Sequence, residues 1–204
     1  PVLFGGVLPT LARAASEARL TQDRTALDER VAEVAGRTGD DTLPVHLDEH
    51  VLRALEQLIG TPGARKRTRL VLSRMREHEP TVREVLSRLS LPFELAAVAF
   101  VESGFVANAR PNEAQATGLW QLTPAAARTH GLTVTAERDD RLDPRLATEA
   151  AARMLHDGHM ELGDWSLALA AYHQGPGAVA RAITQVGTRD ATTLQSSGWI
   201  GPYR

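Results

Sequence analysis

Apolar side chains recur every three or four positions through much of the chain, which is the period of a helix with one buried face. Near the N-terminus, a glycine follows each of two such stripes and is expected to end the helix. The first stripe consists of Leu27, Val31 and Val34, and the second of Leu47, Val51, Leu55 and Leu58. Residues 37–44 between them have the composition of a loop. The pattern predicts additional helices before the main domain.

Helical patterns also predominate after residue 60. We expect one helix over residues 68–79 and another that begins at Pro80, because proline suits the first helical position. The apolar side of this second helix would carry Val82, Val85, Leu86 and Leu89. Residues 156–159 are expected to form a loop between helices. The predicted fold class is all-α, with an N-terminal helical arm or appendage over residues 1–60 and a main domain over residues 61–204.

Residues 91–105, LPFELAAVAFVESGF, are almost entirely apolar, which predicts a helix that is buried on all sides. Ser90 is the expected N-cap, with Pro92 and Glu94 in the first turn. Glu102 then lies near the C-terminal end, where burial and the negative pole of the helix macrodipole both raise the pKa of its carboxyl. A carboxylic acid that stays protonated near working pH suits general-acid catalysis. The alternative is a helix end at the surface, with Glu102 in water.

Residues 118–124, GLWQLTP, predict a turn followed by a helix, because Thr123 suits the N-cap and Pro124 the first helical position. Trp120 and Gln121 are expected in that turn. The Trp120 ring could stack on an apolar sugar face, and the Gln121 amide could both donate to and accept from an acetamido group. The other interpretation of Trp120 is a buried core side chain.

Residues 170–177, AAYHQGPG, predict the end of one helix and the start of the next, since Gly175, Pro176 and Gly177 interrupt the helical pattern. Tyr172 is expected at the end of the first of these helices. From that position, its phenol could reach into a cleft and form a hydrogen bond with a carboxyl group.

The chain of 204 residues carries a formal net charge of −2, so there is no general electrostatic case for binding nucleic acid or an anionic membrane. Residues 64–76 are basic, but apolar side chains interrupt them at helical spacing, which favours the solvated face of a packed helix. The chain has no cysteine, which excludes disulfides and thiolate zinc sites. It also has no apolar run of about 18 residues that predicts a membrane span. Residues 1–16 are either the end of a targeting segment or an arm that packs on the domain.

Residues 46–50, HLDEH, match the inverted zinc motif His-x-x-Glu-His. In a metallopeptidase, His46 and His50 would bind the metal and Glu49 would act as the base. The same residues also suit the polar side of an amphipathic helix, and no third ligand is evident. We therefore predict that the protein uses no zinc.

Taken together, three motifs resemble those of the lytic transglycosylases, bacterial enzymes with a goose-lysozyme-like fold that cut peptidoglycan, and most of all the membrane-bound murein transglycosylase D type. Glu102-Ser103 matches the family's Glu-Ser motif. GLWQ at residues 118–121 matches Gly-Leu-Met/Trp-Gln, and AYHQG at residues 171–175 matches Ala-Tyr-Asn-x-Gly. The clear match covers residues 91–183, and residues 1–60 lie outside it.

The resemblance implies cleavage of the β-1,4 bond between N-acetylmuramic acid and N-acetylglucosamine, with a 1,6-anhydro end on the muramyl sugar. It implies that Glu102 acts first as acid and then as base, without a cofactor, on peptidoglycan in the periplasm or cell envelope, or as a secreted enzyme. The residues implied to bind or position the substrate are Ser103, Gly118, Trp120, Gln121, Tyr172 and His173. Two positions depart from the family pattern: His173 replaces the usual asparagine, and Gln115 lies where glycine is common, in a longer loop.

Two other functions remain open. A hydrolytic muramidase on the same fold would need a second carboxylate to position water. Asp139, Asp140 and Asp143 are the candidates for that role. A peptidoglycan-binding or assembly module without activity is the other alternative, which the presence of Glu102, Gln121 and Tyr172 disfavours. The sequence leaves the oligomeric state open.

Overall fold

The structure is a computed structural model that describes Ala54 and residues 57–201. The chain divides into two compact units between Arg76 and Glu77, within helix α4 (Pro62–Arg88). The helices expected over residues 27–58 lie largely outside the described residues, as do residues 1–16 and the HLDEH motif. The predicted domain boundary at residue 60 stays a prediction.

In the first unit, the start of α4 is tied to the short helical segment 57–59. The Arg65 guanidinium donates a hydrogen bond of 2.7 Å to the carbonyl of Ile59. The Thr68 hydroxyl donates one of 2.6 Å to the carbonyl of Leu58. Thr61 accepts from the backbone N–H of Ala64 at 3.1 Å and so caps the helix start.

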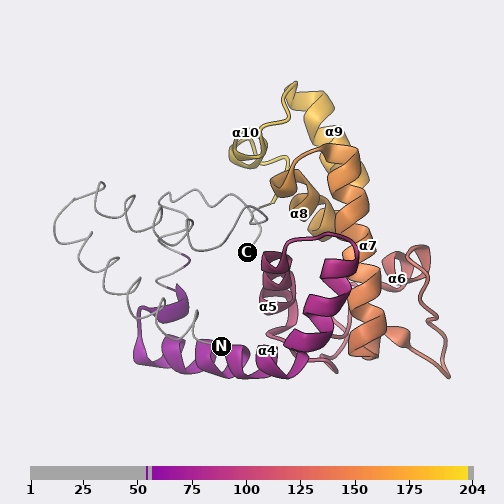
Figure 1. Ribbon diagram of the computed structural model, residues 1–204. Helices are drawn as coiled ribbons and strands as arrows, with labels where there is room; N and C mark the ends of the chain where they lie inside the picture. The colour runs from indigo at the N-terminus through magenta and orange to yellow at the C-terminus, as the bar shows by residue number, and fades with distance from the viewer. Residues whose placement is uncertain (1–53, 55–56, 202–204) are drawn as a thin grey trace. The chain divides into compact units, whose positions relative to one another are not determined.

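The second unit is built from helices joined by loops (Figure 1). After α4, the elements are the 3-10 helix η1 (Phe93–Ala96), α5 (Ala97–Ser103), α6 (Pro124–Thr129), the 3-10 helix η2 (Asp140–Leu142), α7 (Pro144–Leu162), α8 (Trp165–Gln174), α9 (Pro176–Val186) and α10 (Ala191–Ser196). In the described part of the chain, β-pairing is limited to two isolated bridges, Thr117–Leu122 and Val134–Asp139. The prediction of an all-α fold is confirmed.

Helix α7 forms the centre of this unit and packs along α8, which in turn packs against α9 (Figure 1). Small side chains on α7 are completely buried, which allows neighbouring elements to approach closely: Ala147, Ala150, Ala151 and Ala152. The Trp120 ring is also completely buried, and its indole N–H donates to the hydroxyl of Thr148 on α7 at 2.8 Å. A second apolar cluster joins α8, α9 and α10 through Leu167, Val179 and Leu194.

Pro80 does not begin a new helix, because α4 runs without interruption from Pro62 to Arg88 and contains it. A proline inside a helix loses one backbone hydrogen bond and costs roughly 3 kcal/mol. Val82, Val85 and Leu86 are 1–2% exposed, and their burial offsets that cost. The prediction of two helices on either side of Pro80 is therefore wrong.

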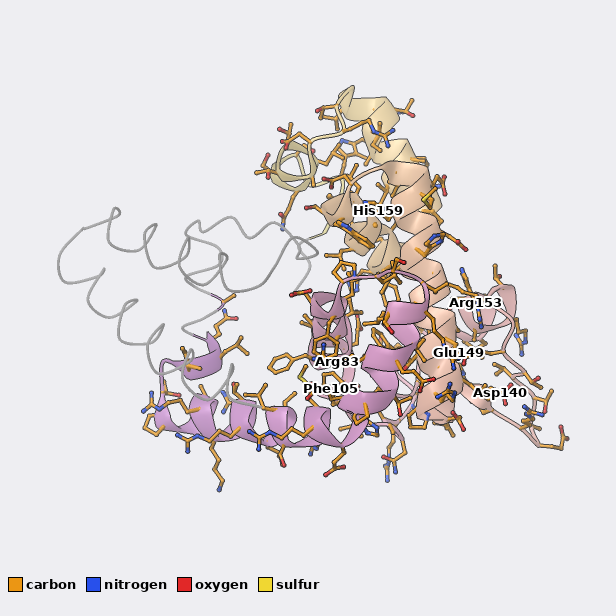
Figure 2. The ribbon with its side chains drawn as sticks, viewed as in Figure 1. Arg83, Phe105, Asp140, Glu149, Arg153 and His159 are labelled. Carbon is orange, nitrogen blue, oxygen red and sulfur yellow. The ribbon has the colours of Figure 1, made fainter. Side chains whose placement is uncertain are left out.

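Residues 156–159 do not form a loop, because they lie inside α7. Helix α7 continues to Leu162 and is capped by Gly163, whose φ of 69° is the left-handed conformation that favours glycine. A Cβ at Gly158 would lie 3.6 Å from the Cβ of Ala168, so Gly158 marks a close approach between α7 and α8. His159, shown in Figure 2, stacks on Trp165 of α8 with ring centroids 4.0 Å apart.

The apolar segment before Glu102 differs from the prediction in two respects. Ser90 has a φ of 53° and does not cap the helix; η1 begins after Pro92, and α5 only at Ala97. Val101 is 45% exposed, so this short helix is not buried on all sides. A helix of two turns buries only the face that packs inward, whatever the composition of its outer face.

The buried Trp120–Thr148 hydrogen bond gives a test of the core. Thr148→Val keeps the volume but leaves the indole N–H of Trp120 without its acceptor, so we expect a loss of about 1–3 kcal/mol in the free energy of unfolding. Thr184→Val is the matched control, since the Thr184 hydroxyl donates to the carbonyl of Ala180 on the exposed side of α9. That change should cost less than about 0.5 kcal/mol. Urea denaturation measures the free energy of unfolding of both variants. Equal losses would contradict a stabilising role for the Trp120–Thr148 hydrogen bond.

Candidate active site

Glu102 occupies the last turn of α5, which ends at Gly104 with a left-handed φ of 60°. Its side chain is only 18% exposed, so the alternative of a carboxyl in open water is wrong. Burial raises the pKa of Glu102, and it is the largest influence on that pKa. The predicted direction of the shift is therefore confirmed, and the acid form persists to a higher pH than in a solvated glutamate.

His173 of α8 lies beside Glu102, with its Nδ1 atom 3.5 Å from Oε1 of the carboxylate. The imidazole is 46% exposed. When protonated, it attracts the carboxylate and lowers the pKa of Glu102, which opposes the larger effect of burial. The contact brings the residue that departs from the family pattern directly to the proposed acid.

Ser103 connects the end of α5 to the turn that contains Trp120. Its hydroxyl donates to the carbonyl of Leu119 at 2.7 Å and accepts from the backbone N–H of Val106 at 3.1 Å. These bonds hold the loop that leaves α5 close to the GLWQ motif. A direct contact of Ser103 with the scissile sugar stays a prediction.

Gly118 is required by a backbone-to-backbone contact. Its φ is 80°, and a Cβ there would lie 2.1 Å from the carbonyl oxygen of Arg141. Its N–H donates to the carbonyl of Ala109 at 3.2 Å. The structure thus gives Gly118 a clear role in closing the loop, while its predicted contact with substrate remains a prediction.

Gln121 also adopts the left-handed region, with a φ of 48° that is costly for a residue with a Cβ. Its side-chain amide donates to the carbonyl of Gly118 at 3.1 Å, which stabilises the turn. The side chain is partly exposed. Strained, partly exposed polar residues of this kind are concentrated at functional sites.

Trp120 does not offer a surface for stacking, because its side chain is completely buried. The expectation that its ring binds an apolar sugar face is wrong, and the alternative of a core side chain holds. The indole N–H finds its partner in Thr148, as a buried polar group requires. The backbone of Trp120 nevertheless belongs to the site, because its carbonyl is the acceptor for Tyr172.

Tyr172 is buried near the end of α8, and its hydroxyl donates to the carbonyl of Trp120 at 2.7 Å. The hydroxyl proton is directed to this backbone carbonyl, and the expected hydrogen bond between the phenol and a carboxyl group stays a prediction. The contacts of Ser103, Tyr172 and His173 together bring the three sequence motifs to one place. Glu102 lies where they meet.

The three acids considered for a second catalytic carboxylate all serve the fold. Asp139 forms an ion pair with Arg141 at 2.7 Å, and hydrogen bonds from Arg141 lower its pKa. Asp140 (Figure 2) pairs with Arg138 at 2.6 Å, which lowers its pKa. Asp143 caps α7 by accepting from two backbone N–H groups at 2.9 Å.

The family model of the Transglycosylase SLT domain matches residues 86–195, more than half of the chain. The chain belongs to this family. The matched range contains Glu102, the GLWQ motif and Tyr172, and the all-α architecture is the lysozyme-like fold expected from the resemblance. Among the residues that the structure describes, no group of three or more His, Cys, Asp or Glu side chains is suited to bind a metal ion. No helix in that part is long and apolar enough to cross a membrane.

The alignments with curated relatives cover about half of this chain. The chain is 37% identical over 109 residues to "Membrane-bound lytic murein transglycosylase D" of Escherichia coli K12, and this alignment covers 53% of the chain and 24% of the relative. It is 41% identical over 106 residues to a "Putative tributyltin chloride resistance protein" of Alteromonas sp., covering 52% and 50%. "Peptidoglycan transglycosylase gp16" of phage T7 is 43% identical over 86 residues, covering 41% and 6%. The chain therefore spans half or less of the length of each relative.

Arg141 is a structural residue of the SLT domain that the sequence analysis missed. It is 6% exposed, and its guanidinium donates to the carbonyls of Gln115 and Leu122 at 2.6 and 3.0 Å, in addition to its pair with Asp139. It thus joins η2 to the long loop at two of its carbonyls. The signal in the sequence was an arginine between acids in DDRLDP, which only burial distinguishes from a surface arginine.

Replacing Gly118 tests the backbone contact. Gly118→Ala forces a left-handed φ on a residue with a Cβ and pushes that Cβ against the Arg141 carbonyl, so we expect a loss of roughly 2–5 kcal/mol in the free energy of unfolding. Gly163→Ala is the control, because Gly163 also has a positive φ but nothing within 4 Å of a Cβ. Only the conformational cost of about 1–2 kcal/mol applies there. Denaturant unfolding that gives the same loss for both variants would argue against this role of Gly118.

Proposed function

We propose that this SLT domain is a peptidoglycan lytic transglycosylase. It cleaves the β-1,4 bond between N-acetylmuramic acid and N-acetylglucosamine and leaves a 1,6-anhydro end on the muramyl sugar. The observation that carries the proposal is the environment of Glu102: a largely buried carboxyl with a raised pKa, at the meeting point of the three motifs, in a chain of this family. The names of two relatives support the same reaction class.

A single carboxyl suffices for this reaction. Protonated Glu102 gives its proton to the glycosidic oxygen as the bond from that oxygen to the muramyl C1 breaks. The resulting carboxylate then takes the proton of the muramyl 6-hydroxyl as its oxygen bonds to C1. Water is not consumed and the acid is restored, so neither a metal nor an organic cofactor enters the balance.

The side chains around Glu102 divide into two groups in this proposal. Gln121 is partly exposed and His173 is exposed, and we assign both to contact the substrate. Ser103, Gly118, Trp120 and Tyr172 hold the turn and the helix ends in place through the contacts described above. Such support is needed because catalysis depends on geometry held to within a fraction of an ångström.

The hydrolytic muramidase is the second candidate, and it needs another carboxylate near the scissile bond. Asp139, Asp140 and Asp143 are each engaged with arginines or backbone N–H groups of their own loop, which favours the transglycosylase. A binding module without activity would have no need for a buried acid. We place the substrate, and hence the enzyme, in the bacterial cell envelope, with residues 61–204 carrying the activity and residues 1–60 as an appendage.

Replacing Glu102 tests the identity of the acid. Glu102→Gln keeps the shape but cannot transfer the proton, so the release of soluble fragments from purified sacculi should fall by at least about 100-fold. Glu161→Gln, at an exposed position of α7, is the matched control and should retain full activity. Thermal melts establish that both variants are folded. Near-normal turnover by Glu102→Gln would contradict the assignment of the acid.

The fragments themselves distinguish the proposed reaction from its alternatives. A transglycosylase releases muropeptides that end in 1,6-anhydro-N-acetylmuramic acid, whereas a muramidase releases reducing ends that are heavier by one water. Mass spectrometry of the digest should show mainly anhydro ends. Mainly reducing ends would replace the transglycosylase by the muramidase, and firm binding to sacculi without cleavage would favour the binding module.

A further inference from the structure

Two titratable groups in the site touch each other. Nδ1 of His173, from α8, lies 3.5 Å from Oε1 of Glu102, from α5. The distance is that of an ion pair and is longer than a charge-assisted hydrogen bond of about 2.7–2.9 Å. The Glu102 side chain is 18% exposed and that of His173 46%, so the acid is shielded while the imidazole is accessible to solvent.

No other charge lies on the two helices that form this contact. Helix α5 carries no charged residue besides Glu102, and α8 none besides His173. Of the elements packed against these two helices, η1 carries Glu94 and α9 carries Arg181, and the charged or titratable residues of α7 are Arg145, Glu149, Arg153, His156, Asp157, His159 and Glu161. The loop after α5 carries Arg110 and Glu113. His173 is the charged group whose effect on Glu102 is resolved. The protonation of one group of the pair therefore acts on the other.

We propose that His173 is a positioning residue that controls where the reaction's proton resides, by stabilising the carboxylate form of Glu102 whenever the imidazole is charged. This inference rests on the proposed function, since it concerns the acid of that reaction. At 3.5 Å, a charged imidazole favours the ionised form of the carboxyl, so protonation of Glu102 is less favourable while the imidazole is charged. An asparagine in this position would be neutral at every pH and would leave Glu102 to titrate alone.

The consequence is a pH range in which the acid form is depleted. While the imidazole is charged, the ion pair favours the carboxylate, and less of the enzyme is ready to protonate the glycosidic oxygen. At higher pH the imidazole is neutral and this effect disappears. His173 thus shifts the reaction toward more acidic conditions than burial of Glu102 alone would set.

A titration without substrate tests the coupling directly. The carboxyl carbon of Glu102 is followed by NMR in protein labelled with ¹³C-glutamate, and its signal is assigned by its loss in Glu102→Gln. We expect the titration midpoint of Glu102 to rise in His173→Asn and in His173→Gln. His156→Asn is the control, since this imidazole is 42% exposed and pairs with Asp157 on α7, and it should leave the midpoint unchanged. A midpoint that stays the same or falls in both His173 variants would overturn the proposal.

The pH dependence of kcat/KM on peptidoglycan then shows whether the coupling affects the reaction. Relative to its own maximum, His173→Asn should be roughly 3- to 10-fold more active than the parent in the range where the imidazole is charged and Glu102 is largely ionised. The two profiles should converge at higher pH. Superimposable profiles would refute the proposal. Absence of cleavage by the parent would refute the proposed function instead, and the NMR titration would still decide the coupling.

Discussion

The arrangement of the site depends on the buried hydrogen bond between the Tyr172 hydroxyl and the Trp120 carbonyl. This bond joins α8 to the turn before α6, while the indole of the same tryptophan binds Thr148 on α7. One residue of the turn is thus held from two helices, by its backbone and by its side chain. Since Ser103 also donates to the carbonyl of the adjacent Leu119, the end of α5 is fixed relative to the same turn. Together, these bonds bring segments about 70 residues apart in sequence to one place around Glu102.

The features that could be predicted from the sequence depend on local chemistry. Thr123 and Pro124 start α6 as expected, with the Thr123 hydroxyl accepting from the N–H of Ala126, because capping involves only neighbouring residues. The break between α8 and α9 at Gly175 has the same origin. The position of Glu102 near a helix end, and the direction of its pKa shift, followed from the apolar run before it. The all-α class followed from the helical period.

The predictions that failed depend on what another part of the chain contributes. Pro80 and Gly158 are helix breakers by local preference, but burial of neighbouring side chains and close packing against Ala168 keep both inside helices. Trp120 was open to two interpretations because a sequence does not reveal which face of a turn is buried. The contact of His173 with Glu102 was also beyond prediction, since it depends on how α8 packs beside α5.

The central claim is that Tyr172 positions the site through the Trp120 carbonyl, and Tyr172→Phe tests it most directly. The variant keeps the buried ring and loses only the hydroxyl. Below its unfolding temperature, kcat on peptidoglycan should fall by about 10- to 100-fold because the turn no longer holds its geometry, with KM nearly unchanged. An unchanged kcat in a folded variant, or a rise in KM alone, would contradict the account.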